Sequence, residues 1–138
     1  MFWFALACGE PSGGPDPTVC DRVSESTRTL LPGPVADDAV TLPMDSEPYT
    51  VRLAQGAMSY LAIEVIEVDT NATLYLGAAD VASSLWQGDT EVGLPEPVES
   101  PCPDDIPDQR ELVLPTVGLW TLVLAESELE EVWVLLQP

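Results

Sequence analysis

Apolar and polar residues alternate along much of the chain from position 49 onward. This period of two predicts strands that bury one face and turn the other towards solvent. The predicted strands lie at 49–53, 61–65, 74–76, 111–114, 118–124 and 131–136. The alternation slips at residues 66–68, which indicates a bulge or the end of a strand. The turn residues Asp69-Thr70-Asn71 follow directly.

The last predicted strand has two candidate buried faces. Val132, Val134 and Leu136 form one apolar row, and Trp133 and Leu135 form the other. A strand that is buried on one side only would turn one of these rows to solvent. The sequence leaves both choices open.

About seven to eight short strands, separated by turn residues and without a convincing helix, predict an all-β fold. We expect an antiparallel β-sandwich of jelly-roll-like form, built as a single domain over residues 20–138. We interpret residues 125–131 as a hairpin loop, because this segment is too short for more than one helical turn. Residues 81–110 contain prolines from Pro95 to Pro107 and many carboxylates, so we expect no central strand there.

The N-terminus changes abruptly from apolar to loop-forming residues. Residues 1–8 are apolar, whereas 9–18 are rich in glycine and proline. The segment ending in Ala5-Leu6-Ala7-Cys8 resembles the signal peptide and lipobox of a bacterial lipoprotein. The resemblance implies that residues 1–7 are a signal peptide, that its true start lies upstream, and that Cys8 becomes lipid-modified. Residues 8–19 would then be the lipidated cysteine and a flexible tether.

The chain has three cysteines, and an odd number in an exported protein requires an explanation. Lipidation of Cys8 would supply it and would leave Cys20 and Cys102 as a natural disulfide pair. Closing so long a loop stabilises the folded state by roughly 4 to 5 kcal/mol. The alternative is three buried, reduced thiols in a cytosolic protein.

Composition excludes several kinds of chemistry. The chain has 24 acidic residues against 4 basic ones, all of which are arginines, and it has no histidine, so its formal net charge is −20. Histidine-based triads, histidine-ligated zinc, a P-loop lysine and Schiff-base chemistry all lack their residues. Nucleic acid is not an expected partner, because phosphates require a basic surface. We therefore expect a non-catalytic protein.

Several features of the predicted strands occur together over residues 34–137. They are residues 49–53 followed by Gly56, the long strand to Val68, Asp69 before Leu74-Tyr75-Leu76, and Gly118-Leu119-Trp120 opening the strand 118–124. This arrangement is similar to that of the bacterial pre-peptidase C-terminal domain family, whose members are small β-sandwich modules attached to exported proteins. The resemblance implies a β-sandwich outside the cytoplasm. It also raises the prospect of calcium, which some members bind.

Asp104, Asp105 and Asp108 are the candidate metal ligands. Calcium prefers six to eight oxygen ligands from carboxylates and loop carbonyls, and this proline-rich segment offers both. The alternative is a solvated acidic loop that protects a sheet edge from aggregation. We expect no other cofactor.

Trp86 and Asp89 are the candidate ligand-binding residues, within the turn-rich stretch Trp86-Gln87-Gly88-Asp89. An exposed indole beside amide and carboxylate groups is typical of a carbohydrate-stacking platform or an interface. The alternative is an aromatic side chain that only caps the core.

Together these observations predict an exported, lipid-anchored, non-catalytic binding or structural module of the bacterial cell envelope, at the outer membrane or the cell surface. Its partners would be the membrane, through the lipid, and an envelope protein or a glycan. One alternative is a carbohydrate- or calcium-dependent adhesion module, which an exposed Trp86 beside carboxylates would favour. Another is an accessory subunit of an envelope complex, which an apolar patch of Leu119, Val123 and Ile66 would favour.

Overall fold

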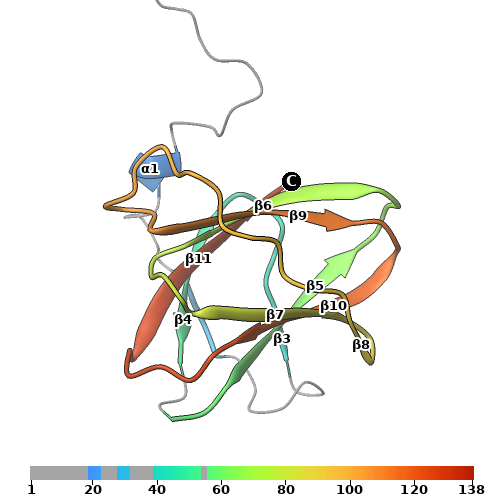
Figure 1. Ribbon diagram of the computed structural model, residues 1–138, viewed down its shortest axis with the longest axis horizontal. Helices are drawn as coiled ribbons and strands as arrows, with labels where there is room; N and C mark the ends of the chain where they lie inside the picture. The colour runs from blue at the N-terminus through green and yellow to red at the C-terminus, as the bar shows by residue number, and fades with distance from the viewer. Residues whose placement is uncertain (1–18, 23–27, 32–38, 54–55) are drawn as a thin grey trace, which may run out of the picture.

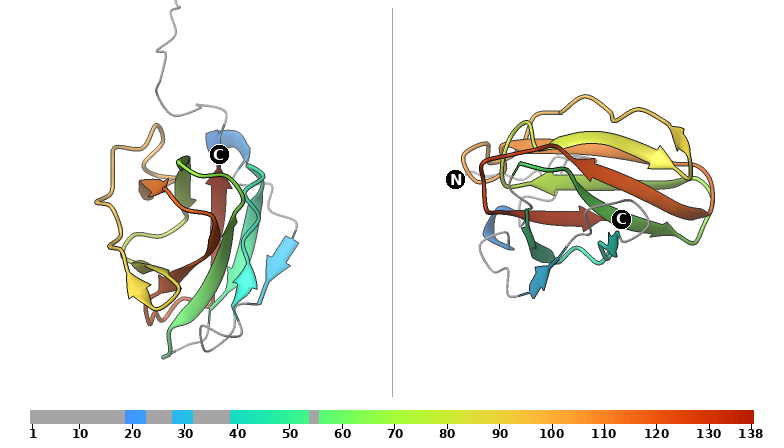
Figure 2. Two further views of the ribbon diagram at one scale, coloured as in Figure 1. Left: turned by 90° about the vertical axis from the view of Figure 1, so that its right-hand side faces the viewer. Right: turned by 90° about the horizontal axis from the view of Figure 1, so that it is seen from below.

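The structure is a computed structural model that describes residues 19–22, 28–31, 39–53 and 56–138. A four-residue helix, α1 (Val19–Arg22), precedes ten strands. The strands are β2 (Arg28–Leu30), β3 (Val40–Thr41), β4 (Pro48–Arg52), β5 (Ser59–Val65), β6 (Thr70–Leu76), β7 (Ala82–Gln87), β8 (Thr90–Glu91), β9 (Asp108–Leu114), β10 (Gly118–Leu124) and β11 (Glu131–Gln137). They form two layers that pack face to face (Figures 1 and 2).

Each layer is a five-stranded sheet. Sheet I has the order β2-β4-β11-β6-β9, and sheet II has the order β3-β5-β10-β7-β8. Within them the antiparallel pairs are nested: β4 pairs with β11, β5 with β10, β6 with β9 and β7 with β8. This nesting of eight strands over two sheets is the jelly-roll arrangement. The predicted all-β sandwich of jelly-roll-like form is therefore confirmed.

The total of ten strands exceeds the predicted seven to eight because two short strands extend the jelly roll. β2 joins the edge of sheet I beside β4, and β3 joins the edge of sheet II beside β5. Both additions are parallel, so the sheets are mixed rather than purely antiparallel. Neither strand exceeds three residues, which is too short for a periodic signal in the sequence.

Consecutive strands alternate between the two sheets, with β7 and β8 as the exception in the described chain. The prediction of a hairpin at residues 125–131 is therefore wrong. β10 pairs with β5 and β7 in sheet II, whereas β11 pairs with β4 and β6 in sheet I. The connection crosses from one layer to the other because each strand presents an apolar face that the opposite sheet covers.

The main core lies between the sheets and collects one row of side chains from each long strand. Its largest fully buried member is Trp120, whose indole Nε1 donates a hydrogen bond to the carbonyl of Thr116 over 3.1 Å. The predicted strand end is confirmed, because β5 stops at Val65, directly before the slip in alternation. The predicted turn is confirmed as well, since Asp69 adopts a left-handed backbone with φ of 56°.

The segment 81–110 contains a strand that we did not expect. β7 lies between β10 and β8, so it occupies an interior position in sheet II. Val81 and Leu85 bury their side chains in the main core. The prolines did not prevent this, because they begin at Pro95, beyond the end of β8. The segment from β8 to β9 then runs along one side of the sandwich (Figure 2, left).

The inner face of sheet I is buried, and so is part of its outer face. Tyr75 and Leu135 point away from the main core, yet they are 1% and 0% exposed. Val19 of α1 and Ile106 of the loop before β9 cover them and form a second, smaller core. Trp133 packs against this cluster. Both candidate faces of the last strand are thus buried, which explains why its sequence shows no preference.

A disulfide closes the second core. Cys20 in α1 and Cys102 in the loop are bonded, with their Cα atoms 6.1 Å apart and 82 positions between them in sequence. Figure 1 shows α1 beside this loop, above β9 and β11. The predicted pairing is confirmed, whereas Cys8 lies outside the described residues. The bond joins two segments that have little secondary structure of their own.

The phenol of Tyr49 links the start of β4 to its neighbours. Its hydroxyl donates to a carboxylate oxygen of Asp45 over 2.6 Å and accepts from the guanidinium of Arg28 over 3.4 Å. The Arg28 guanidinium carbon lies 6.0 Å from the ring centroid. Burial and the bond to Asp45 raise the pKa of Tyr49, against the opposing effect of Arg28. These contacts tie β2 to the edge of sheet I.

Replacing both Cys20 and Cys102 by serine should lower the free energy of unfolding by about 4 kcal/mol, because the unfolded chain regains the freedom that the long closed loop removes. Urea denaturation followed by tryptophan fluorescence measures the change. The matched control is Cys8→Ser, which retains the bond and should unfold at the same urea concentration as the wild-type protein. An unchanged midpoint after reduction of the wild type would contradict the prediction.

Candidate ligand-binding face

The outer face of sheet II differs from that of sheet I. Leu61, Ile63, Leu85, Trp120 and Leu122 point into the main core, so the alternate residues of these strands point outwards. Neither apolar cluster of the described residues extends over this outer face. A ligand can therefore contact the side chains of this face directly.

A hollow of about 380 Å³ lies on this face, across β5, β10 and β7. In the registry of the sheet, Tyr60 stands opposite Val123, and Thr121 stands opposite Trp86. The two aromatic residues thus lie diagonally across β10, on the two strands that flank it, and the smaller Val123 and Thr121 lie on β10 between them. The hollow has aromatic walls and a low floor. Its remaining lining is Met58, Ser83, Ser84, Gly88 and Asp89.

The indole of Trp86 is held in place by its own strand. Its Nε1 donates a hydrogen bond of 2.9 Å to the hydroxyl of Ser84, two residues earlier and on the same face. The ring is half-buried, so part of it remains accessible. A fixed, partly accessible ring loses little conformational freedom when a ligand packs against it.

The two predicted ligand-binding residues, Trp86 and Asp89, line the same hollow. Asp89 lies in the turn between β7 and β8, where it is exposed. Tyr60 and Met58 were not predicted as site residues. The alternation in the sequence places Tyr60 on the outward row of its strand, but only the pairing of β5 and β7 with β10 shows that it lines the same hollow as Trp86.

The predicted calcium ligands do not come together. Asp108 is the first residue of β9 and is 3% exposed, and its carboxylate forms an ion pair with the guanidinium of Arg110. Asp104 and Asp105 are exposed in the preceding turn. Within the described ranges, no group of three acidic or cysteine side chains is placed to hold a metal ion. The reason is that Asp108 belongs to the sheet and not to the loop.

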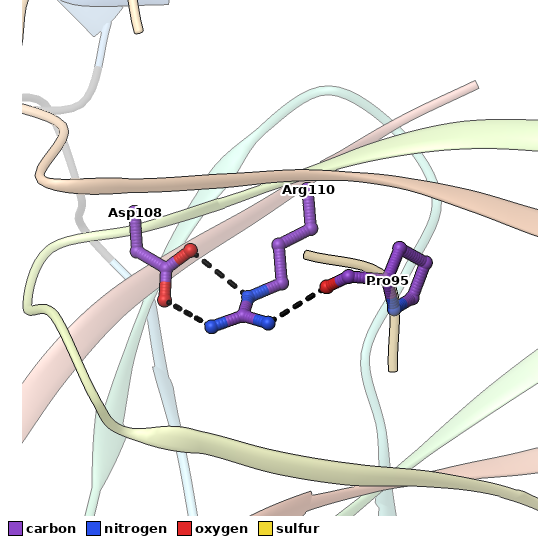
Figure 3. Close-up of polar contacts among 3 residues, drawn as sticks. All are labelled: Pro95, Asp108 and Arg110. Atoms are coloured by element: carbon purple, nitrogen blue, oxygen red, sulfur yellow. Dashed lines mark hydrogen bonds and ion pairs between the residues drawn. The ribbon is translucent and has the colours of Figure 1, made fainter. Parts of the chain in front are cut away.

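Arg110 fastens the acidic loop to the sandwich. Its Nε and one terminal nitrogen donate to the two carboxylate oxygens of Asp108, over 3.0 and 3.2 Å. The other terminal nitrogen donates to the carbonyl of Pro95 over 2.7 Å. Figure 3 shows the guanidinium between these two acceptors. A bidentate, largely buried pair of this kind orients a loop as well as stabilising it.

The predicted apolar patch is divided. Ile66 and Leu119 are 76% and 62% exposed, whereas Val123 is 7% exposed and forms part of the floor of the hollow. Ile66 follows the end of β5, and Leu119 lies at the start of β10 beside it. These two residues therefore lie at one end of the sandwich.

The fold and the site together define a jelly-roll β-sandwich with one covered sheet and one sheet face that carries an aromatic hollow. No helix in the described part of the chain has the length and apolar character needed to cross a membrane.

Comparison with known proteins gives a distant structural likeness. No protein-family model matches the chain, and no curated protein matches it. Among solved structures the chain is similar to Salmonella Typhimurium PliG, a periplasmic lysozyme inhibitor of g-type lysozyme. The two share 12% identity over 71% of this chain and 95% of PliG, with a TM-score of 0.46. The resemblance to pre-peptidase C-terminal domains stays a prediction.

Replacing Arg110 by methionine should lower the free energy of unfolding by about 3 kcal/mol, because it leaves the buried carboxylate of Asp108 without its partner. Thermal and urea denaturation measure this change. Arg52→Met is the matched control, since Arg52 is exposed at the end of β4, and its effect should stay within about 0.5 kcal/mol. Equal stability of the two variants would show that the ion pair contributes nothing.

Proposed function

We propose that this protein is an exported, non-catalytic binding module of the bacterial cell envelope, and that it binds its partner through the hollow beside Trp86. The observation that carries the proposal is that Trp86 and Tyr60 lie on either side of a shallow floor. They lie on the outer face of sheet II, which neither apolar cluster of the described residues covers. Accessible aromatic side chains around a concave surface are typical of binding sites.

Export is supported by the disulfide between Cys20 and Cys102, because such bonds persist in oxidising compartments and are rare in the cytosol. A non-catalytic role is supported by the chemistry of the hollow. Its one ionisable carboxylate is Asp89, and neither histidine nor lysine occurs in the chain to act as a base. Attachment through a lipid on Cys8 would keep the domain at the membrane surface, with residues 9–18 as the spacer.

The exposed Ile66 and Leu119 support a second candidate function, that of an accessory subunit. An apolar end of the sandwich would pack against another envelope protein there, independently of the hollow.

If the hollow binds an envelope component, the Cys8→Ser variant, which cannot be lipidated, should sediment with isolated envelopes of the native organism. The double variant Cys8→Ser, Trp86→Ala should no longer sediment with them. Truncating the indole removes one wall of the hollow. The matched control is Leu119→Ser, on the same face of sheet II but outside the hollow. Loss of binding with Leu119→Ser alone would favour the accessory-subunit candidate instead.

The lipid anchor has its own test. In the native host the wild-type chain should incorporate a radiolabelled fatty acid and partition with the membranes. The Cys8→Ser variant should incorporate none and should be recovered in the soluble fraction, because one thiol carries the modification. Membrane association that survives this substitution would contradict lipidation at Cys8.

A further inference from the structure

The hollow has the dimensions and surface of a site for a small, flat, amphipathic ring. Neighbouring strands are about 4.8 Å apart and residues rise about 3.4 Å along a strand. Tyr60 on β5 and Trp86 on β7 are two strands apart across the sheet and two residues apart along it, so they rise from positions about 12 Å apart. Val123 and Thr121 keep the floor between them low. The volume of about 380 Å³ falls within the range of ligand pockets.

Polar groups surround the aromatic walls. Ser83, Ser84 and Thr121 contribute hydroxyls, and Asp89 contributes a carboxylate from the turn after β7. A pyranose ring matches this arrangement, because its C–H faces pack on aromatic rings while its hydroxyls both donate and accept hydrogen bonds. A purely apolar ligand would leave the hydroxyls and the carboxylate without partners.

The backbone at the floor of the hollow is not available for recognition. β10 is paired with β5 on one side and with β7 on the other, so its peptide groups are engaged in the sheet. An extended peptide that binds by adding a strand needs a free edge, and the hollow offers a face instead. Recognition here depends on side chains, as it does for a sugar.

The charge of the protein further restricts the chemical class of the ligand. The chain carries a formal net charge of −20, and the residues that line the hollow include Asp89 and no arginine. Sulfated sugars and uronic acids would be repelled from this surface. Neutral saccharides have no such penalty.

We infer that the hollow between Tyr60 and Trp86 is a binding site for neutral saccharides. This inference rests on the proposed function, in that the hollow is the binding site, and adds the chemical class of its ligand. Trp86 supplies the main stacking surface, in an orientation held by Ser84, and Tyr60 supplies the opposite wall. Asp89 accepts hydrogen bonds from the sugar hydroxyls and disfavours anionic sugars.

Isothermal titration of the full chain with neutral tetrasaccharides tests the inference, with β-1,4-linked glucose, α-1,4-linked glucose and β-1,4-linked N-acetylglucosamine as probes. At least one should bind saturably, and the α-1,4-linked galacturonic acid tetrasaccharide should not. Trp86→Ala and Tyr60→Ala should each weaken the binding by about tenfold or more. Trp86→Phe, which retains a ring but not the bond to Ser84, should lose less than Trp86→Ala.

Glu64→Gln changes an exposed side chain on the outward row of β5, outside the hollow. It is the matched control and should bind as the wild type does, and circular dichroism verifies the fold of each variant. Absence of saturable binding to all three neutral probes at millimolar concentration overturns the inference, as does binding that persists in folded Trp86→Ala and Tyr60→Ala. If Trp86→Ala still abolishes sedimentation with envelopes, the hollow retains its proposed function and binds a protein. If both assays fail, the proposed function fails too.

Discussion

The burial of Tyr75 and Leu135 is the constraint on which the arrangement of this molecule depends. Both side chains point out of the jelly roll, and without cover they would expose a large apolar surface on sheet I. Val19 and Ile106 supply that cover from two segments far apart in the sequence. The disulfide between Cys20 and Cys102 holds these segments together, so that a short helix and an irregular loop act as a third layer.

This third layer gives the outer faces of the two sheets different exposure to solvent. The outer face of sheet I is partly covered by α1 and by the loop before β9, which Arg110 also fastens through Pro95. The other face keeps its side chains accessible around Trp86. A ligand therefore meets a rigid sheet surface whose aromatic residues are held by strand pairing, and binding there requires little rearrangement of the backbone.

Much of the fold could be predicted from the period of two, because alternation reports directly on which side of a strand is buried. The C-terminal end of β5 and the turn at Asp69 could be predicted as well, because both depend on local sequence. The strand with which each strand pairs could not be predicted. Residues 125–131 have the length of a hairpin loop, yet they connect two sheets, since local sequence does not record which strand lies alongside. The same holds for β7, an interior strand that we did not predict because the segment after it is rich in proline.

The pairing of Cys20 with Cys102 was one of two possibilities that the sequence left open. By itself the sequence determined the all-β class and the exclusion of histidine and lysine chemistry, because these follow from composition and local periodicity. It also singled out Trp86 and Asp89. Only the tertiary structure decided that Tyr60 and Trp86 flank β10 on the same face of sheet II, and that the carboxylate of Asp108 forms an ion pair with Arg110. The first outcome depends on registry between strands distant in the chain, and the second on the burial of the first residues of β9. Both are set by the packing of the whole sandwich.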